Sequence, residues 1–240
     1  MELKRVVVTG LGALTPVGNN VAETWENLVK GVSGAGPITH FDASKFKTQF
    51  ACEVKGFNGA DFIDRKEVRK MDLYTQYAIV AAKEAIADSE MDLEKEDLNK
   101  IGVIYGVGIG GIHTFEEEVL GYAQTKDTIG PKFSPFFIPM EIPNMSAGQI
   151  AIATGLKGPN TAIVTACATG TNCIGDALRT IQYGDADVML AGGTEAAVSP
   201  IAIAGFANMK ALSTNNENPE AASCPFDKKR DGFVMGEGAG

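Results

Sequence analysis

The chain has 240 residues, a formal net charge of −9 at pH 7, 45% hydrophobic residues and 21% charged residues. A chain of this length buries about 70% or more of its unfolded surface, which is enough for one sizeable soluble domain. Because nucleic acid is bound by a basic face, the acidic balance argues against it as the main partner. The four cysteines match no zinc spacing, and their scatter suits a reducing cytoplasm.

The first segment, Leu3 to Thr9, is apolar and predicts a short strand rather than the long apolar core of a secretory signal. A glycine-rich turn follows it. Asn20, with Glu23 three residues later, predicts the N-cap of a helix that ends before Gly31. The residues expected to form the buried stripe of this helix are Val21, Trp25, Leu28 and Val29.

An irregular stretch, residues 32–58, predicts a long loop with short strands, and residues 61–89 are expected to be helical. One side of that helical region is expected to carry Leu73, Tyr77, Val80, Ala81 and Ala85. Four cations gather before this stripe, at residues 65–70. Such a run is usually a solvated helix face. In a chain of net charge −9 it also suits the docking of an acidic partner.

A second strand is predicted from Ile101 to Gly106, and the glycines at 106, 108 and 111 fit the pattern G-x-G-x-x-G. This spacing raises the alternative of an NAD(P)-dependent oxidoreductase. That function also requires a carboxylate at the end of the next strand, about 20 residues later. The residues from 131 onward provide neither a strand nor an acid. We therefore expect the glycines to let the backbone approach a substrate arm or a neighbouring strand.

Beyond these glycines, the sequence predicts a helix that carries three glutamates, Glu116 to Glu118, and then an excursion rich in proline and phenylalanine, residues 124–143. Asn144 is expected to cap a short helix, Met145 to Thr154. The later elements are expected to be a strand from Val188 to Ala191, a helical or looped stretch at 200–212, a polar turn region at 215–225 and a strand that begins at Phe233.

Two apolar stretches, residues 133–156 and 188–209, each hold a single charged side chain, Glu141 and Glu195 respectively. A membrane-spanning helix needs about 20 consecutive apolar residues. Prolines and glycines interrupt both stretches. We therefore interpret both as buried core and expect no membrane partner.

The stretch from Thr161 to Tyr183 sets a cysteine between a predicted strand and a predicted helix. An apolar, β-branched run, Thr161 to Thr165, predicts a buried strand, and small residues lie on both sides of Cys167. The helix that follows ends before Gly184. Its apolar face is expected to be formed by Ile174, Ala177, Leu178 and Ile181.

The position of Cys167 favours a nucleophile, because the N-terminal end of a helix stabilises an anion and the thiolate is the reactive form of cysteine. Free N–H groups at that end could also hold the oxyanion of a thioester under attack. A buried structural cysteine remains the alternative. Cys173 is expected to pack as a small apolar residue. His40 and His113 are distant from Cys167 in sequence and are expected to be solvated or packing side chains.

Strands alternate with helices along the chain, which predicts an α/β layered sheet with helices on both faces. Four separate motifs then carry a resemblance: VVVTGLGALTPVG near the N-terminus, TACATG around Cys167, GGTE from Gly192, and FDKKRDGFVMGEGAG at the end. Over all 240 residues the chain resembles the β-ketoacyl-acyl carrier protein synthase family. Within that family it is most similar to the type II fatty-acid condensing enzymes that elongate long acyl chains.

The resemblance implies the thiolase-like fold, in which two βαβαβαββ halves with mixed sheets pack around a five-layer core. Residues 1–240 would be the N-terminal half, and the C-terminal half would be absent from this chain, which stops at Gly240. The family places two catalytic histidines and a catalytic lysine in that second half. The chain alone is therefore expected to lack condensing activity and to be aggregation-prone.

The function that the resemblance implies is acyl-chain elongation. An acyl group would pass from acyl carrier protein to Cys167, and malonyl-acyl carrier protein would lose carbon dioxide and attack it to give a 3-oxoacyl product. No cofactor or metal is implied, and the enzyme is expected to be a cytoplasmic homodimer. Two alternatives stay open: a carrier-binding or assembly half without condensation of its own, and a ketosynthase of polyketide synthesis.

The resemblance also implies roles for individual side chains. Ile109 matches a position that lines the acyl-chain pocket, Phe137 one that closes the partner subunit's pocket across the dimer interface, and Phe206 a gate near the nucleophile. Asn172 departs from the histidine that many relatives carry there, and no catalytic consequence is inferred from it. The residues implied to receive acyl carrier protein are Lys66, Arg69, Lys70 and Lys210.

Overall fold

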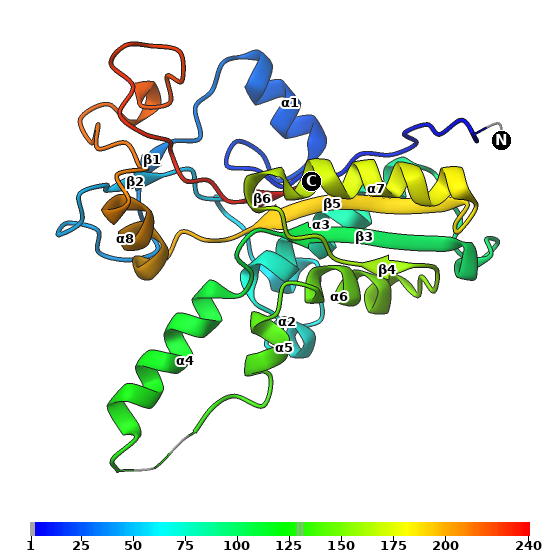
Figure 1. The fold of residues 1–240 in the computed structure, drawn as a ribbon, viewed down its shortest axis with the longest axis horizontal. Coiled ribbons are helices and arrows are strands. Elements are labelled where there is room, and N and C mark those ends of the chain that lie inside the picture. Colours follow the sequence, from blue (N-terminus) through cyan, green and yellow to red (C-terminus); the bar gives the residue numbers. More distant parts are fainter. Residues whose placement is uncertain (1–2, 129, 131) are drawn as a thin grey trace.

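A mixed four-stranded sheet forms the centre of the fold (Figure 1). The computed structural model describes residues 3–128, 130 and 132–240, and within them the strand order is β4-β3-β5-β6. β3 pairs in parallel with β4 and β5, and β6 pairs antiparallel with β5. The strands of this sheet and of a separate antiparallel pair are β3 (Ile101–Val107), β4 (Asn160–Thr161), β5 (Val188–Glu195), β6 (Gly238–Ala239), and β1 (Gly36–Pro37) with β2 (Phe50–Ala51).

The central strand β3 is buried along its whole length because helices cover both faces of the sheet. Ile104 packs toward α7, whereas Val103 and Tyr105 pack in the cluster that contains residues of α3 and α6. A continuous apolar strand is typical of a sheet that is covered on both sides. The predicted α/β sheet with helices on both faces is therefore confirmed, and β5 is longer than predicted, since it ends at Glu195.

The helices that cover the sheet begin and end close to the predicted positions. The single helical region predicted for 61–89 is divided in two, and the longer part begins after Asp72, whose side chain accepts the N–H of Tyr74. Of the stripe predicted there, Tyr77, Val80 and Ala81 are buried. These helices are α2 (Arg65–Val68), α3 (Leu73–Asp88), α6 (Met145–Thr154) and α7 (Thr169–Tyr183).

The helices α4 and α5 form a hairpin that projects away from the sheet (Figure 1). The predicted excursion at 124–143 lies in this hairpin, although two of its residues, 129 and 131, lie outside the described residues. None of the described helices is long and apolar enough to cross a membrane. The remaining helices are α1 (Val21–Val29), α4 (Ile112–Thr125), α5 (Phe137–Glu141), α8 (Pro200–Asn208) and the 3₁₀ turns η1 (Gly59–Asp61), η2 (Leu98–Lys100), η3 (Ala166–Ala168) and η4 (Pro219–Ala221).

Helix α1 has the predicted cap but not the predicted buried face. The side chain of Asn20 accepts the N–H of Glu23 at 2.8 Å, as expected. The predicted stripe is wrong, because Trp25 is 67% exposed and Val29 is 70% exposed. The helix instead turns its Thr24 side inward, where the hydroxyl donates to the carbonyl of Gly18 at 3.2 Å. Leu28, also expected in the stripe, is exposed as well.

Three predicted strands are short or missing at the edges of the sheet. Residues 3–9 form no strand, and Val7 and Val8 are exposed. The run 161–165 contributes only its first residue to β4, and Phe233 makes one isolated bridge before β6 begins at Gly238. Strand pairing requires a neighbour on the hydrogen-bonding side. Among the described residues, the run 3–9 has no such neighbour. The run 161–165 pairs with β3 no further than Thr161, and the stretch from Phe233 bonds to residues 211–213 and to Cys52 without forming a regular ladder.

Candidate active site

The site is built around a tight turn that presents Cys167 to solvent. The turn η3 immediately precedes α7, and Ala166 adopts a left-handed backbone with φ of 51°. The hydroxyl of Thr169 donates to the carbonyl of Ala166 at 2.7 Å and accepts the N–H of Thr165 at 2.9 Å. A left-handed conformation costs a non-glycine residue about 1–2 kcal/mol. These hydrogen bonds hold the turn in that conformation and leave the thiol uncovered.

Glycines seat this turn directly on the sheet. A Cβ on Gly106 would lie 2.1 Å from the carbonyl oxygen of Ile163 and 2.5 Å from the methyl carbon of Thr169. A Cβ on Gly193 would lie 2.9 Å from the Cα of Gly170. Real Cβ contacts are longer than this, so a side chain at either glycine would push the turn away. The prediction that Gly106 allows close approach to a neighbouring segment is confirmed.

The loop that follows β3 is tied to the end of β5 by a carboxylate. Glu195 Oε2 accepts the N–H of Gly108 at 3.1 Å and the N–H of Ile109 at 3.0 Å. A Cβ on Gly108 would lie 2.8 Å from that oxygen and 3.4 Å from the carbonyl oxygen of Ala166. A phosphate would need such backbone N–H groups for itself. Because these N–H groups already donate to the carboxylate of Glu195, they do not favour binding of a dinucleotide phosphate. The alternative of an NAD(P)-dependent oxidoreductase is therefore disfavoured.

Glu195 is a functional candidate that the sequence interpretation missed. Burial raises the pKa of this carboxyl to about 7, and the backbone N–H groups at Oε2 oppose the rise. Its other oxygen, Oε1, is buried without a hydrogen-bond partner among the described residues. A signal was present in the sequence, because Glu195 is the only charge between residues 188 and 209.

The far side of the same loop contacts the hairpin. Gly110 has φ of 94°, and the N–H of Gly111 donates to the carbonyl of Glu141, in α5, at 3.0 Å. Ile109, in the middle of the loop, is 36% exposed. Phe137, at the start of α5, stacks on Phe133 and Phe115, with ring centroids 5.3 Å and 6.4 Å away. The structure thus links the loop of Ile109 to the helix of Phe137.

Phe206 lies in another part of the fold. It is on α8, beyond the end of β5 (Figure 1), and packs against the cluster that contains Ile203 and Leu212. Its ring meets Phe233 edge-on, with centroids 5.5 Å apart.

Three of the four predicted docking cations are close in sequence and lie in or just after α2. Lys66 and Arg69 are exposed. Lys70 is half-buried, because its ammonium bonds Glu67 at 2.6 Å and lies 5.8 Å from the ring centroid of Phe136. Lys210 follows α8 instead and is exposed there, with φ of 57°. Of the four cations at residues 65–70, three are exposed and make no ion pair among the described residues: Arg65, Lys66 and Arg69.

The two histidines and Cys173 are engaged in packing. His40 Nε2 lies 3.2 Å from Glu237 Oε2, and this hydrogen bond raises the pKa of the imidazole. The ring of His113 meets that of His40 edge-on at 6.2 Å. Cys173 is fully buried in the cluster of Ile104, where burial raises the pKa of its thiol.

Solved structures that match this fold include ketosynthases, and the fold is thiolase-like. A beta-ketoacyl synthase from Burkholderia phymatum STM815 superposes with a TM-score of 0.86 at 30% identity, over 99% of this chain and 58% of that one. A type II PKS acyl-carrier protein in complex with its ketosynthase bound to the hexaketide gives 0.85 at 33% identity, over 99% and 57%. Residues 3–240 match the family described as Beta-ketoacyl synthase, N-terminal domain, so the chain belongs to the beta-ketoacyl synthase family.

Curated relatives agree with this assignment. The 3-oxoacyl-[acyl-carrier-protein] synthase 2 of Staphylococcus aureus (strain COL) is 54% identical over 237 residues, which are 99% of this chain and 56% of that protein. The protein of the same name from Synechocystis sp. is 50% identical over 242 residues, which are 100% of this chain and 57% of that protein. The chain thus spans about half the length of the curated relatives it matches.

Proposed function

We propose that the chain supplies the nucleophile for fatty-acyl elongation, in a protein that condenses an acyl group with malonyl-acyl carrier protein in the cytoplasm. The observation that carries this proposal is the exposed thiol of Cys167 on a turn that Thr169 holds at the start of a helix. The 54% identity to a 3-oxoacyl-[acyl-carrier-protein] synthase 2 supports the fatty-acid reaction. It exceeds the 33% identity to the ketosynthase bound to a hexaketide, which makes polyketide synthesis the weaker candidate.

In the first step, the thiolate of Cys167 attacks the carbonyl of the acyl thioester. A new C–S bond forms, the bond to the carrier breaks, and the carrier thiol leaves with a proton. The backbone N–H of Cys167 would donate to the oxyanion, and the N-terminal end of α7 favours the negative charge. In the second step, malonyl-carrier protein loses carbon dioxide, its carbanion attacks the acyl carbonyl, and Cys167 leaves as thiolate. The histidines and lysine for this step would come from a C-terminal half.

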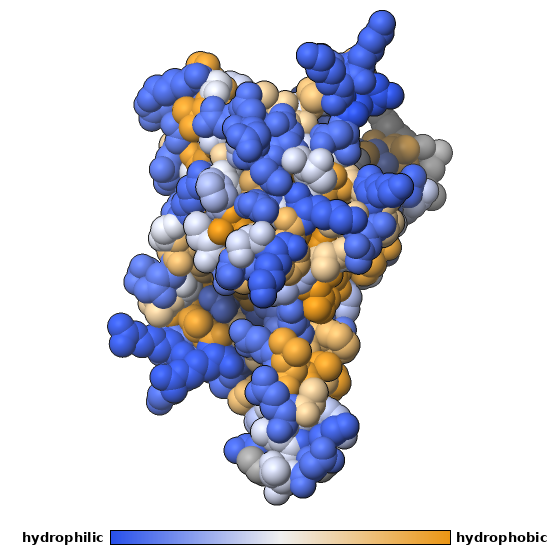
Figure 2. Space-filling view, turned by 90° about the vertical axis from the view of Figure 1, so that its left-hand side faces the viewer, coloured by the Kyte–Doolittle hydropathy of each residue, from blue (hydrophilic) through white to orange (hydrophobic). Residues whose placement is uncertain are grey.

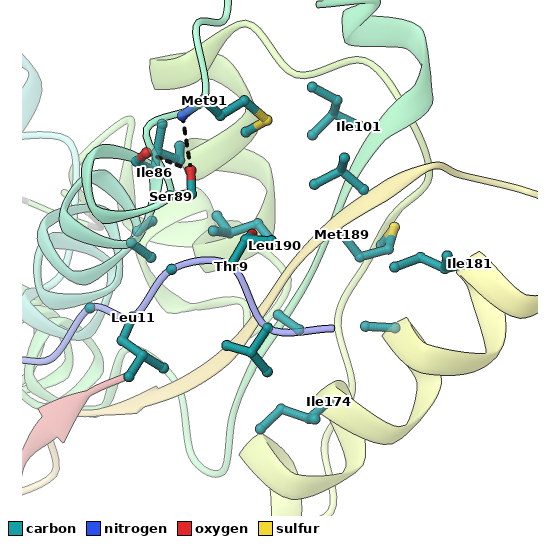
Figure 3. A pocket seen from close by; sticks show the side chains of 18 of the residues that line it. Thr9, Leu11, Ile86, Ser89, Met91, Ile101, Ile174, Ile181, Met189 and Leu190 are labelled. Carbon is teal, nitrogen blue, oxygen red and sulfur yellow. Dashed lines mark hydrogen bonds between the residues drawn. The ribbon is translucent and has the colours of Figure 1, made fainter. Parts of the chain in front are cut away.

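We also propose that residues 1–240 are the N-terminal half of a larger ketosynthase. A cavity of about 540 Å³ lies between the segment 5–12 and the side of β5 (Figure 3). Leu11, Leu190 and Ile174 line it from the segment, β5 and α7 respectively (Figure 3). Its walls are formed by an extended segment, a strand and the helices α3 and α7, and most of the lining side chains are apolar.

The hydrogen bonds around Gly240 support a strand as the occupant of this cavity. Gly240 and Gly193 exchange both backbone hydrogen bonds at 3.0 Å, and Ala239 exchanges two more with Leu14 at 2.8 and 2.9 Å. β6 therefore already lies between β5 and the N-terminal segment. A continuation of β6 would enter the cavity and pair with both neighbours. It would also give the apolar residues 3–9 the partner that they lack.

The function is tested by finding where an acyl group attaches. The protein for this test joins the chain to the C-terminal part of the Staphylococcus aureus relative, which is absent from residues 1–240, and is called the completed protein below. Incubation with acyl-acyl carrier protein is expected to add one acyl group, which peptide mapping by mass spectrometry places on Cys167. The reason is that Cys167 is exposed, whereas Cys173 is fully buried.

The variant Cys167→Ala is expected to lose the acyl group entirely, and Cys173→Ala is the matched control that keeps it. Cys224 is partly exposed and serves as an internal check on accessibility alone. Acylation of Cys224, or undiminished acylation in Cys167→Ala, would contradict the proposed nucleophile.

We propose acyl carrier protein as the partner that docks at Lys66 and Arg69. Reversing both to glutamate is expected to raise the Kd for acyl carrier protein about tenfold or more at low salt, because complementary charge across an interface is lost. The difference should shrink as salt increases, since the Debye length falls from about 10 Å at 0.1 M to about 3 Å at 1 M. Binding is measured by titration at several salt concentrations.

The matched control for docking is the double reversal Lys45→Glu and Lys47→Glu, which makes the same charge change at two exposed lysines outside α2. It is expected to alter binding much less. Acylation by a small thioester without the carrier should be unchanged in both double variants. An equal loss with the small thioester would show damage to the site instead of loss of docking.

A second copy of the chain is the other proposed partner. The face shown in Figure 2 gathers apolar atoms on its lower part, over the projecting hairpin. Exposed apolar side chains of α4 and α5 include Phe115, Val119, Leu120 and Ile138. An apolar patch of this kind on a projecting element supports a contact with another subunit. Phe137 lies in the same hairpin, as the expected role across a dimer interface requires.

A further inference from the structure

Glu195 occupies a position between the nucleophile turn and the loop of Ile109. Its Oε2 holds the N–H groups of Gly108 and Ile109 at 3.1 and 3.0 Å. Gly108 lies between that oxygen and the carbonyl of Ala166, since a Cβ there would be 2.8 Å from one and 3.4 Å from the other. Ala166 precedes Cys167 and has the left-handed backbone of the turn. Only Gly108 thus lies between the carboxylate and the turn that carries Cys167.

The loop has two anchors, and Glu195 provides one of them. The hydrogen bond from Gly111 to the carbonyl of Glu141 holds the far end of the loop against α5. Oε2 of Glu195 holds the near end, because it accepts hydrogen bonds from the consecutive N–H groups of Gly108 and Ile109. Without the carboxylate, these two N–H groups would lose their acceptor, and a lost partner costs more than a hydrogen bond contributes. The position of Ile109 relative to Cys167 therefore depends on Glu195.

We propose that Glu195 is a positioning residue for acyl transfer, which holds the Gly108–Ile109 backbone against the turn of Cys167 so that the acyl chain and the nucleophile stay aligned. This inference rests on the proposed function. It goes beyond it because it assigns a role to a side chain that does not itself touch the thioester. Alignment matters because small displacements of reacting groups lower rates steeply.

Because Glu195 acts through its carboxylate, the rate of acyl transfer is expected to depend on whether this carboxyl is protonated. Burial raises the pKa of this carboxyl to about 7, with a smaller contribution from Asp72. Burial, with smaller contributions from the charges of Asp72, Glu141 and Glu195, raises the pKa of Tyr74 in α3 to about 12. A carboxylate accepts hydrogen bonds more strongly than a carboxylic acid. Ionisation therefore tightens the hold on the loop as the pH rises through about 7.

The raised pKa of Glu195 also affects the stability of the fold, and there a rising pH is unfavourable. Because the native carboxyl binds its proton more tightly than the unfolded one, the native state loses stability as the pH rises from about 4.5 to about 7. Replacing Glu195 by glutamine removes this loss. A purely structural glutamate would change stability with pH but would not change the alignment of the acyl chain.

The experiment compares Glu195→Gln and Glu195→Ala in the completed protein. The readout is the rate of Cys167 acylation by a long-chain acyl thioester and by an acetyl thioester, from pH 6 to pH 8. Alanine is expected to lower the long-chain rate relative to the acetyl rate about tenfold. Glutamine keeps an acceptor oxygen and should retain most of that preference. The ratio of the wild-type rate to the glutamine rate should rise about threefold between pH 6 and pH 8, because the two proteins differ only at residue 195 and all other effects of pH on the rate cancel in the ratio.

Glu84 offers a matched control, since its two oxygens accept the N–H groups of Val21 and Ala13 at 2.8 and 2.9 Å. Its alanine and glutamine variants remove the same kind of anchor away from the loop of Ile109. They are expected to leave the chain-length preference and the pH ratio unchanged. Equal behaviour of the Glu195 and Glu84 variants, with Cys167 acylated in wild type, would overturn the positioning role and leave the proposed function standing. Absence of acylation at Cys167 in wild type would overturn both. If Glu195→Ala does not fold, the change with pH in the ratio of the wild-type rate to the Glu195→Gln rate still tests the positioning role.

Discussion

The variant Gly106→Ala is expected to destabilise the completed protein by about 3 kcal/mol, at the upper end of what overpacking usually costs. The added Cβ would lie 2.1 Å from the carbonyl oxygen of Ile163, which is backbone and cannot rotate away. The central strand β3 and the segment after β4 would therefore have to separate. The measurement is the midpoint of urea unfolding, converted with the slope of the transition.

Gly175→Ala is the control within α7, the helix that Gly106 helps to seat. A Cβ on Gly175 has no atom within 4 Å, and the residue lies inside the helix. Alanine there is expected to raise stability by about 0.5–1 kcal/mol, because it restricts the unfolded chain and favours helix. The two substitutions make the same chemical change with opposite expected signs. A loss below about 0.5 kcal/mol for Gly106→Ala would contradict the close seating of the turn.

The 240-residue chain by itself is expected to give no detectable 3-oxoacyl product, whereas the completed protein is expected to be active. Decarboxylation leaves an enolate, and neutral histidines are suitable groups to stabilise it. His40 does not suit this role, because its hydrogen bond to Glu237 raises its pKa and favours the charged ring. His113 Nε2 is buried. Both proteins are assayed with acyl- and malonyl-acyl carrier protein, and product is detected by mass spectrometry.

The state of association should change along with the activity. The open cavity beside β5 and the exposed Val7 and Val8 leave apolar surface and strand edges uncovered in the chain alone. We expect the chain alone to aggregate and the completed protein to form dimers, as measured by light scattering. Full condensing activity from a soluble 240-residue chain would contradict the proposal that the second half is required, whatever the result of the acylation test.

Most of the fold could be predicted where a local pattern and its burial agree. The apolar run at Ile101 predicted β3 because helices cover both of its faces, and Asn20 predicted the start of α1 because a cap is a local interaction. The run at Leu3 carries an equally strong strand pattern, yet it forms no strand. Its pairing depends on a neighbour that the described residues do not supply.

The candidate site was predictable in part, for a related reason. Cys167 was identified because small residues and a strand-to-helix change are visible in sequence. The left-handed backbone of Ala166 could not be predicted, because this conformation is usually adopted by glycine or asparagine. Glu195 was also missed: its isolated charge is visible in the sequence, but its partners are backbone N–H groups, which no side-chain pattern identifies.

The pairing of Leu14 with Ala239 brings together residues from near the two ends of the chain. During synthesis, β3 and β5 can associate once Glu195 has emerged, while Leu14 has to wait until Ala239 is made. Contacts between such distant residues carry a large loop-closure entropy and slow folding. The segment around Leu14, although made before β3 and β5, would then be among the last of the described parts of the sheet to reach its final position. Val7 and Val8 are exposed even when Leu14 is paired, so they can meet other nascent chains, and a chaperone that binds short apolar segments would find one there.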